Sequence, residues 1–379
     1  DENGAYRLDD TIIRSEVAKM AIHALGLEDA AESSKGQTMF DDVSAEHWAN
    51  GYINLAVSQG IIEGDGDGNF RPNAPISYAE AMTIMVRATG YTVSAEENGG
   101  YPHGYMKTGT SNGLAKNVQG SYSDKISRGN VAYLTTNALE SKLMEQTGFG
   151  SDGKYEITEK TLLKDKLKVT KDTGRITAIE NTSLTGSSSL AKGQIKIDNK
   201  TYETAYNMNN LLGYNVTYYV KNEGKNDESV ILAMPIQNQN NDLTISSELF
   251  SKLTTKNGNT AIEYFKDENT SKTNTAEISS DATLIYNGKY QAMDKSLIDL
   301  TDKSGNITLL DSNKNGKYDI VFVKNYENIV VDTVSSTGKI VDKYSQKVLK
   351  LDDTVDFRIT KGLEEISVSD LAEYDVLSV

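Results

Sequence analysis

The 379-residue sequence has no cysteine, one tryptophan and three histidines. The absence of cysteine excludes disulfides, thiolate nucleophiles and cysteine-ligated zinc. His23, His47 and His103 all lie in the first third of the chain, so the rest has no imidazole for acid–base catalysis. After residue 150 the sequence also lacks a Gly-x-Ser-x-Gly nucleophile elbow and a phosphate-binding loop. With so little support for catalysis, we predict that the chain is not an enzyme.

Positive charge is scarce as well, because 39 lysines and arginines stand against 54 aspartates and glutamates. The formal net charge of -15 would repel a phosphate backbone or an anionic membrane over most of the surface. No apolar run approaches the roughly 18 residues that a membrane-spanning helix needs. We therefore predict neither a nucleic-acid partner nor membrane insertion. The length is sufficient for about two or three domains with separate cores.

The first 150 residues contain an internal repeat. The segment that begins at Gly4 aligns without a gap with the segment that begins at Gly68. In a weaker third copy Ile126 aligns with Ile76. The copies divide this part into three modules, at about 1–37, 38–92 and 93–150, of which the first is partial.

The middle module has the pattern of a helix, a loop and a second helix. Ser44 is predicted to cap the first helix, and Gly60 offers the left-handed position that ends it. The glycines between residues 64 and 68 predict tight turns in the loop. Ser77 and Glu80 fit a capping box at the start of the second helix. The buried stripe of this helix is expected to consist of Met82, Met85, Val86 and Thr89.

The middle module resembles the S-layer homology (SLH) module. The resemblance is carried by Phe40-Asp41-Asp42-Val43, His47-Trp48-Ala49, Gly64-Asp65-Gly66, Phe70-Arg71-Pro72 and Ile76-Ser77-Tyr78-Ala79-Glu80. It implies a mostly α-helical pseudo-trimer of three modules that attaches bacterial surface proteins to a secondary cell-wall polysaccharide, often a pyruvylated one. The first helix of module one would precede Asp1, so we expect the chain to be a fragment of a longer polypeptide.

The family places an arginine just inside the second helix of a module. A cation there faces the positive end of the helix dipole, which costs up to about 1 kcal/mol, so local stability does not explain it. We expect an external anion such as a pyruvyl carboxylate to be its partner, bound by the guanidinium together with the free backbone amides at the helix start. Arg14 and Arg128 keep this arginine, whereas Tyr78 replaces it in the middle module. Module three also has Asn130 in place of the family's glutamate and Tyr101 in place of its tryptophan. The sequence therefore predicts that the groove of the middle module is altered or does not bind, and that the changes in module three, which also has a shorter loop, damage its groove as well.

The resemblance implies a polysaccharide-binding set made of Arg14, Asp42, Trp48, Gly64 and Arg128. Trp48 would be available to stack on a sugar. Other interpretations remain open: Trp48 as core filler, Asp42 as a helix-capping carboxylate, and Arg14 as a surface ion-pair partner.

From about residue 154 the pattern changes to short alternating runs typical of half-buried strands. We predict all-β domains, barrel or sandwich-like, at 151–236 and 237–333, and the start of a further one at 334–379. The last segment resembles the first β domain, with Gly338-Lys339-Ile340 aligned on Gly174-Arg175-Ile176. If this repeat is real, the second copy is expected to continue beyond Val379.

One loop in this β-rich part has the opening of a calcium site. Oxygen ligands would come from Asp311, Asn313, Asn315, the Lys317 carbonyl and Asp319, with Gly316 at the sixth position. The twelfth position is Phe322 instead of glutamate, and a strand pattern follows instead of a helix. A plain Asn-Gly hairpin turn is therefore the alternative to calcium, and no other cofactor is predicted.

Together these observations predict a structural protein secreted to the bacterial cell wall. It would be anchored through its SLH modules, while its β domains form or project from a homo-oligomeric S-layer. The alternative is the anchor portion of a surface-attached hydrolase or adhesin. A catalytic signature elsewhere in the full-length gene product would favour that alternative.

Overall fold

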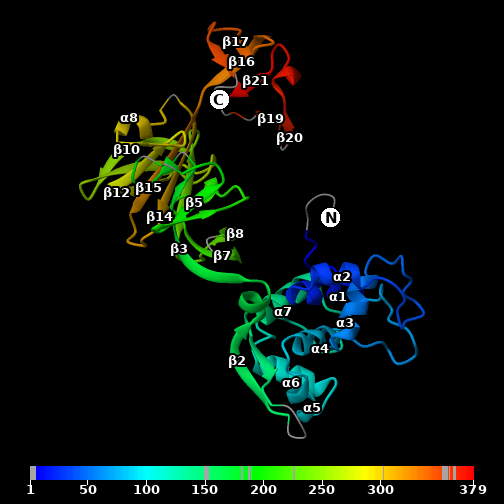
Figure 1. Ribbon diagram of the computed structural model, residues 1–379. Coiled ribbons are helices and arrows are strands. Elements are labelled where there is room, and N and C mark those ends of the chain that lie inside the picture. The colour runs from blue at the N-terminus through cyan, green and yellow to red at the C-terminus, as the bar shows by residue number, and fades with distance from the viewer. Residues whose placement is uncertain are drawn as a thin grey trace. The chain divides into compact units, whose positions relative to one another are not determined.

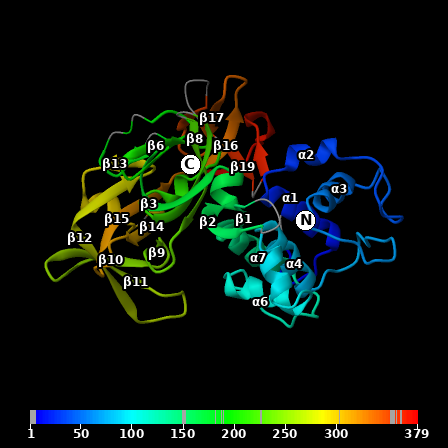
Figure 2. The ribbon, with the colours of Figure 1, turned by 60° about the horizontal axis from the view of Figure 1, so that its bottom comes forward.

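The computed structural model describes residues 6–148, 153–180, 182–186, 188, 190–224, 227–301, 303–351, 357, 359–361 and 364–379. The chain divides into two compact units, residues 1–170 with 220–228, and residues 171–219 with 229–379. A helical N-terminal region, blue to cyan in Figures 1 and 2, is followed by extensive β-sheet, green to red. This confirms the expected multidomain order of α before β. Among the described residues no helix is both long and apolar enough to cross a membrane.

The helices of the first unit pack around one hydrophobic core. They are α1 (Arg14–Ala24), α2 (Glu28–Ser33), α3 (Asn50–Ser58), α4 (Tyr78–Ala88), α5 (Thr92–Glu97), α6 (His103–Ser111) and α7 (Arg128–Glu140). The predicted stripe of α4 is confirmed, because Met82, Met85, Val86 and Thr89 are all buried. The core also includes Ile22, Ile53, Tyr105 and Leu134.

A closed ring of backbone hydrogen bonds joins the three repeats. The Ile12 amide donates to the Ile126 carbonyl (3.3 Å), Ile126 to Ile76 (3.0 Å), and Ile76 back to Ile12 (3.1 Å). All three isoleucines are buried, so these bonds satisfy backbone groups that water cannot reach. Each isoleucine lies just before one of the helices α1, α4 and α7, so the ring fixes where these three helices begin.

The first two amides of each of these helices are also engaged by a neighbouring repeat. Arg14 and Ser15 donate to the carbonyls of Ala74 and Pro72. Tyr78 and Ala79 donate to Asp124 and Tyr122, and Arg128 and Gly129 donate to Asp10 and Leu8. The expectation that free amides at the helix starts help to bind an external anion is therefore wrong for these two positions of each helix.

The middle module follows the predicted helix signals except at its first helix. Ser77 and Glu80 form the expected capping box, and Gly60 has the left-handed backbone (φ 68°) that ends α3. However, α3 begins at Asn50, so Ser44 does not cap it. The side-chain amide of the buried Asn50 instead donates through Nδ2 to the carbonyls of Gly36 (3.0 Å) and Ser44 (2.9 Å), which holds residues 36–49 in an irregular turn.

The first unit continues beyond the predicted boundary at residue 150. Strands β1 (Lys142–Gln146) and β2 (Tyr155–Thr161) pair antiparallel, and a π-helix, η1 (Leu162–Lys166), follows. Leu143 and Leu162 pack with Ala24 of α1 in a small buried cluster. This β hairpin is therefore part of the helical unit.

The first β sheet has a path of strand pairings that returns on itself. It contains β3 (Val169–Ile179), β4 (Thr182–Ser183), β5 (Gln194–Ile197), β6 (Lys200–Glu203), β7 (Asn215–Gly224) and β8 (Asp227–Pro235). The order is β4-β3-β5-β6-β8-β7, and β3 also pairs with β7. A short 3-10 helix, η2 (Asn209–Leu211), precedes β7.

A seven-stranded sheet and a smaller one follow. The larger contains β9 (Asn241–Ser246), β10 (Phe250–Lys256), β11 (Asn259–Phe265), β12 (Thr273–Tyr286), β13 (Lys289–Gln291), β14 (Ser304–Asp311) and β15 (Tyr318–Tyr326), with α8 (Lys295–Ile298) before β14. Its order is β10-β11-β12-β15-β14-β9, with β13 paired to β12.

The smaller sheet contains β16 (Asn328–Val334), β17 (Lys339–Asp342), β18 (Val348–Lys350) and β21 (Val376–Ser378), in the order β18-β17-β16-β21. Strands β19 (Ile359–Lys361) and β20 (Glu364–Ile366) pair with each other, and η3 (Val368–Asp370) precedes β21.

Ser77 and Ser44 of the middle module provide a test of this fold. Ser77→Ala removes a side-chain cap from α4 and is expected to lower the free energy of unfolding by about 1 kcal/mol. Ser44→Ala is the matched control and should change it by less than about 0.5 kcal/mol, because its carbonyl makes the contact with Asn50. Denaturant unfolding measures both. Equal losses in the two variants would contradict the helix start at Asn50.

Candidate functional site

The Arg14 side chain joins module one to the loop and helix of module two. Its Nη1 donates to Glu80 Oε1 at 2.6 Å, and its Nε donates to the Phe70 carbonyl at 2.8 Å. Asp65 Oδ1 lies 3.6 Å from Nη2, and the side chain is only 10% exposed. Arg14 therefore has a carboxylate partner within the chain, which corrects the expectation that only an external anion could compensate it. The arginine side of this ion pair is buried and Glu80 is partly exposed, so it is not the surface pair that the sequence left open.

Arg128 repeats this arrangement between modules three and one. Its Nη1 lies 2.9 Å from Glu16 Oε1, and its Nε donates to the Tyr6 carbonyl at 3.2 Å. Glu16 and Tyr6 stand at the repeat positions of Glu80 and Phe70, so the two arginines occupy equivalent sites. The Arg128 side chain is 31% exposed, which leaves more of its guanidinium accessible than at Arg14.

Tyr78, which replaces the arginine of module two, and Asn130, which replaces the glutamate of module three, fall at one site. Each arginine pairs with the glutamate of the next module, so these two residues occupy the third site, where an arginine–glutamate pair would otherwise form. Tyr78 is 5% exposed. The side chain of Asn130 accepts the backbone amide of Gln119 at Oδ1 and donates from Nδ2 to the Gln119 carbonyl. The Asn130 substitution therefore leaves the Arg128 pair intact.

A cavity of about 290 Å³ opens beside Arg14. Its lining combines two cations with three carboxylates and one exposed aromatic ring: Arg14, Arg87, Glu63, Asp65, Glu80 and Tyr101. Arg87 pairs with Glu63 at 2.9 Å, and Tyr101 is 59% exposed. From the sequence, Tyr101 was noted only as a replacement for the family's tryptophan, and Arg87 and Glu63 were not named. Arg87 could have been found from its place as a basic residue in the last turn of α4.

Three other predicted residues differ in what they contact. Asp42 accepts the amides of Phe70 (2.8 Å) and Arg71 (2.7 Å), so it caps the loop and not a helix. Gly64 lines the cavity, and a Cβ atom there would collide with the Phe40 ring. Trp48 is 48% exposed and stacks on His47, which excludes the core-filler interpretation.

The ionisation of Glu80 is set by its place between two modules. Burial acts to raise the pKa of Glu80, but hydrogen bonds from Ser77 and the positive charge of Arg14 outweigh it, so the pKa lies below the ordinary value. Glu80 thus remains a carboxylate at neutral pH and holds Arg14 in a fixed position.

Comparison with known proteins agrees with these features of the middle module. Residues 40–82, from the loop before α3 into α4, match the model of the S-layer homology domain. The chain carries an S-layer homology domain. The matched SLH range includes Asp42, Trp48, Gly64 and Glu80, whereas Arg14 and Arg128 lie outside it.

Relatives along longer stretches are surface proteins. The chain is 30% identical over 259 residues to the middle cell wall protein of Brevibacillus brevis, which covers 61% of the chain and 24% of that protein. It is 27% identical over 380 residues to the cell surface protein of Thermoanaerobacter kivui, at 97% of the chain and 44% of the relative. Over 83 residues it is 36% identical to the amylopullulanase of Thermoanaerobacterium thermosulfurigenes, covering 22% of the chain and 4% of the enzyme. The chain spans less than half the length of each.

Outside the SLH region, the predicted calcium loop is a tight connection between β14 and β15. Asp311 is buried and accepts the amides of Asn315 (3.3 Å) and Gly316 (3.0 Å). Asp319 accepts the Ser312 amide at 2.7 Å and pairs with Arg175 at 3.0 Å. Among the described residues no group of three or more acidic, histidine or cysteine side chains is placed to hold a metal. These contacts support the hairpin turn, and calcium binding by Asp311, Asn313, Asn315, Lys317 and Asp319 stays a prediction.

The lowered pKa of Glu80 predicts a specific pH dependence of stability. A carboxyl whose pKa is lower in the folded state contributes stability above its unfolded value, 4.5, and loses it as the pH falls through the folded value. The stability advantage of the wild type over Glu80→Gln should therefore be full at pH 7 and vanish only below pH 4.5. Urea unfolding at several pH values measures it. Glu159→Gln is the control, because Glu159 pairs with Lys142 while 88% exposed, and at pH 7 it should change the free energy of unfolding much less than Glu80→Gln does. An advantage lost already above pH 5 would contradict this account.

The β14–β15 loop gives a second test. The hairpin interpretation predicts that Asp311→Ala lowers the Tm equally in chelator and in millimolar calcium, because the lost hydrogen bonds belong to the protein itself. A calcium-induced rise in the Tm of the wild type, abolished by Asp311→Ala with Asp319→Ala, would instead establish a weak calcium site, with a Kd of about 10⁻⁴ to 10⁻³ M.

Proposed function

We propose that the helical unit anchors the protein to a secondary cell-wall polysaccharide through the two equivalent arginine sites at Arg14 and Arg128. The observation that carries this proposal is the cavity beside Arg14, where guanidinium, carboxylate and aromatic groups from three modules converge. Hydroxyl groups of a sugar both donate and accept hydrogen bonds, and aromatic rings pack on the apolar faces of sugars. The lining of the cavity offers partners for each of these interactions.

The charge at the two sites favours different parts of such a ligand. The cavity beside Arg14 is lined by two arginines and three carboxylates, which suits hydroxyl groups better than a strong anion. Arg128 is more exposed and pairs with Glu16. We infer that an acidic substituent, such as the pyruvyl ketal that the family resemblance implies, is bound at Arg128. By its repeat position Trp48 belongs to this second site, as Tyr101 belongs to the first.

The ring formed by Ile12, Ile76 and Ile126 supports a pseudo-threefold arrangement of the modules. In such an arrangement each site lies between two modules, so binding requires all of the helical unit to be folded. The third site, with Tyr78 and Asn130, lacks both the arginine and the glutamate and is proposed not to bind.

The SLH domain and the related surface proteins support a secreted, cell-wall-associated protein. We propose that its role is structural and that the β domains form or project from a homo-oligomeric S-layer. The alternative is the anchor portion of a surface-attached hydrolase or adhesin, which the similarity of the SLH region to part of an amylopullulanase favours. The proposed structural role is supported by relatives that share most of the chain, including its β part.

Binding to purified cell-wall sacculi tests the anchor. The full chain is expected to pellet with sacculi, and Arg128→Ala should lower the affinity by roughly 10- to 150-fold, the loss of a charge-assisted hydrogen bond worth about 1.5–3 kcal/mol. The wild type should bind more weakly to sacculi stripped of acidic substituents than to intact sacculi. Arg128→Ala should bind equally well to both. Undiminished binding of Arg128→Ala to intact sacculi would refute the proposed role of Arg128.

The Arg14 site needs a variant that keeps its buried ion pair. Tyr101→Ala removes an exposed ring that lines the cavity, and it should weaken binding without changing stability. Tyr133→Ala is the matched control, because Tyr133 is a comparably exposed tyrosine on α7 (50%) that does not line this cavity. Equal affinities of the two variants would remove this cavity from the proposal.

A further inference from the structure

A cleft of about 970 Å³ lies between the first β sheet and the seven-stranded sheet, and all of its lining residues belong to the second unit. One wall is formed by the end of β3, the start of β4 and the connection before β7, which supplies Asn207, Leu212 and Tyr214. The other wall is a face of the seven-stranded sheet. A smaller cavity of about 270 Å³ shares Ile179 and Asn207 with the cleft and continues it along the first sheet. The volume suits a ligand, since binding pockets measure about 300–1,000 Å³ and lie preferentially between domains.

The sheet wall of the cleft is a single row of side chains across four neighbouring strands. Thr308 of β14 stands opposite Thr244 of β9 and opposite Phe322 of β15. Phe322 in turn stands opposite Ile285 of β12. All four line the cleft, and the hydroxyl oxygens of the two threonines lie 2.9 Å apart. Because opposite residues share one face of a sheet, a ligand here would contact side chains and not the backbone of a strand edge.

Contacts beside the cleft join its two walls. The Arg175 guanidinium of β3 lies 3.0 Å from the Asp319 carboxylate of β15. The Thr182 hydroxyl of β4 donates to the Gly288 carbonyl, between β12 and β13. These contacts form the cleft before any ligand is present. A ligand would therefore lose little binding free energy in ordering the walls.

Uncharged side chains that both donate and accept hydrogen bonds dominate the polar lining of the cleft. They are three threonines and three asparagines: Thr182, Thr244, Thr308, Asn207, Asn209 and Asn210. The charged lining residues have both signs, since Glu180 and Asp242 stand against Lys324. The half-buried Phe322 and Tyr214 add aromatic rings. This combination suits a ligand that has many hydroxyl groups, an apolar face and no net charge.

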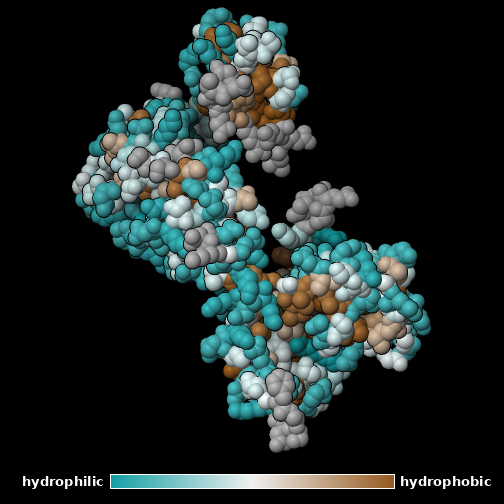
Figure 3. All heavy atoms as spheres, in the orientation of Figure 1, coloured by the Kyte–Doolittle hydropathy of each residue, from teal (hydrophilic) through white to brown (hydrophobic). Residues whose placement is uncertain are grey.

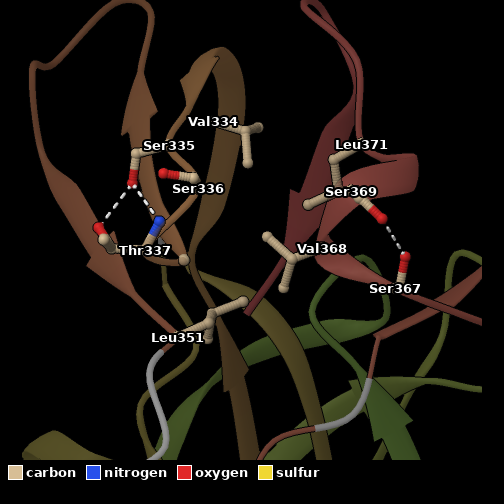
Figure 4. A pocket seen from close by; sticks show the side chains of 10 residues that line it. Val334, Ser335, Ser336, Thr337, Leu351, Ser367, Val368, Ser369 and Leu371 are labelled. Atoms are coloured by element: carbon tan, nitrogen blue, oxygen red, sulfur yellow. Dashed lines mark hydrogen bonds between the residues drawn. The ribbon is translucent and has the colours of Figure 1, made fainter.

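The lining differs from that of another cavity, of about 770 Å³, in the last sheet. Figure 4 shows aliphatic side chains and small hydroxyl groups around it, among them Val334, Leu371 and Ser369. No aromatic ring, carboxamide or charged group is among the described residues that line it. Figure 3 shows a largely hydrophilic surface over the seven-stranded sheet on the face in view, which offers little apolar area to a protein partner. The combination of rings, hydroxyls and carboxamides thus distinguishes the cleft.

We propose that the cleft binds an uncharged oligosaccharide. A sugar ring would pack on the Phe322 ring, and the threonine and asparagine side chains would bond its hydroxyl groups. This site belongs to the second unit and takes uncharged sugars. It is therefore a glycan contact additional to the anchor sites proposed at Arg14 and Arg128.

Calorimetric titration of the full chain with three uncharged hexasaccharides, cellohexaose, maltohexaose and chitohexaose, tests the proposal. At least one of them should bind, and Phe322→Leu should lower its affinity by roughly three- to tenfold, because leucine keeps the apolar packing and loses the aromatic face. Phe265→Leu is the matched control, since Phe265 is a half-buried phenylalanine on β11 that does not line the cleft. Binding of none of the three sugars, or equal losses in the two variants, would overturn the proposal.

A second pair of variants decides the test if Phe322→Leu lowers the Tm. Asn210 is exposed and lines the cleft, so Asn210→Ala should weaken sugar binding at an unchanged Tm. Asn269→Ala, at an exposed asparagine outside the cleft, should not. Equal affinities of these two variants would overturn the proposal.

Two further measurements test the location and the charge preference of the site. Arg128→Ala should bind the hexasaccharide as the wild type does, and loss of binding there with full binding by Phe322→Leu would place the sugar in the helical unit and overturn the proposal. Hexagalacturonic acid, which carries a carboxylate on each sugar, should bind about tenfold more weakly than the uncharged sugar. Equal affinity for both would overturn the proposed preference. Binding to sacculi is a separate measurement, so a failure here leaves the anchor sites untouched.

Discussion

The hydrogen-bond ring formed by Ile12, Ile76 and Ile126 is the constraint on which the helical unit depends. Three buried amides and three buried carbonyls satisfy one another in a closed circuit, so the loss of one member leaves polar groups unpaired on two neighbouring modules. Each bond alone is worth only about 0.5–1.5 kcal/mol. Their closure matters more, because it sets the starting points of α1, α4 and α7 together and so brings each arginine to the glutamate of the next module.

This dependence explains why the candidate sites are both structural and accessible. Arg14 uses Glu80 and the Phe70 carbonyl to hold two modules together, and one side of the same cluster faces a cavity. An arginine that is already held by an ion pair stays in one rotamer. It therefore loses little conformational entropy when a ligand binds. The cation at a helix start, unfavourable for an isolated helix, is stabilised here by a carboxylate from another module.

The sequence was informative where residues within one turn decide the local structure. It was misleading where the structure depends on contacts between residues of different modules. The capping box at Ser77 and the left-handed Gly60 were predictable because each depends on residues within one turn. The pairing of Arg14 with Glu80, 66 residues apart, was not, and this made Asn130 seem to damage the Arg128 site. The family resemblance named Asp42 as a candidate binding residue but did not indicate that its carboxylate caps the loop at Phe70.

The β part shows the same limit in the register of its repeat. Gly174 and Gly338 look equivalent in sequence, yet Gly174 lies inside β3, whereas Gly338 is a left-handed turn residue like Gly193. The backbone geometry is the same in the first and the last β sheets even where the residue type differs. The Gly213 amide, before β7, donates to the Ile176 carbonyl, and the Tyr374 amide, before β21, donates to the Val331 carbonyl. Tyr374 has a positive φ (73°) at the position where Gly213 adopts a similar φ (86°) without strain. A side chain accepts this backbone only where surrounding contacts fix it, and the carbonyl of Val331 does so here. Hydrogen-bond positions, more than residue types, therefore define what the two domains share.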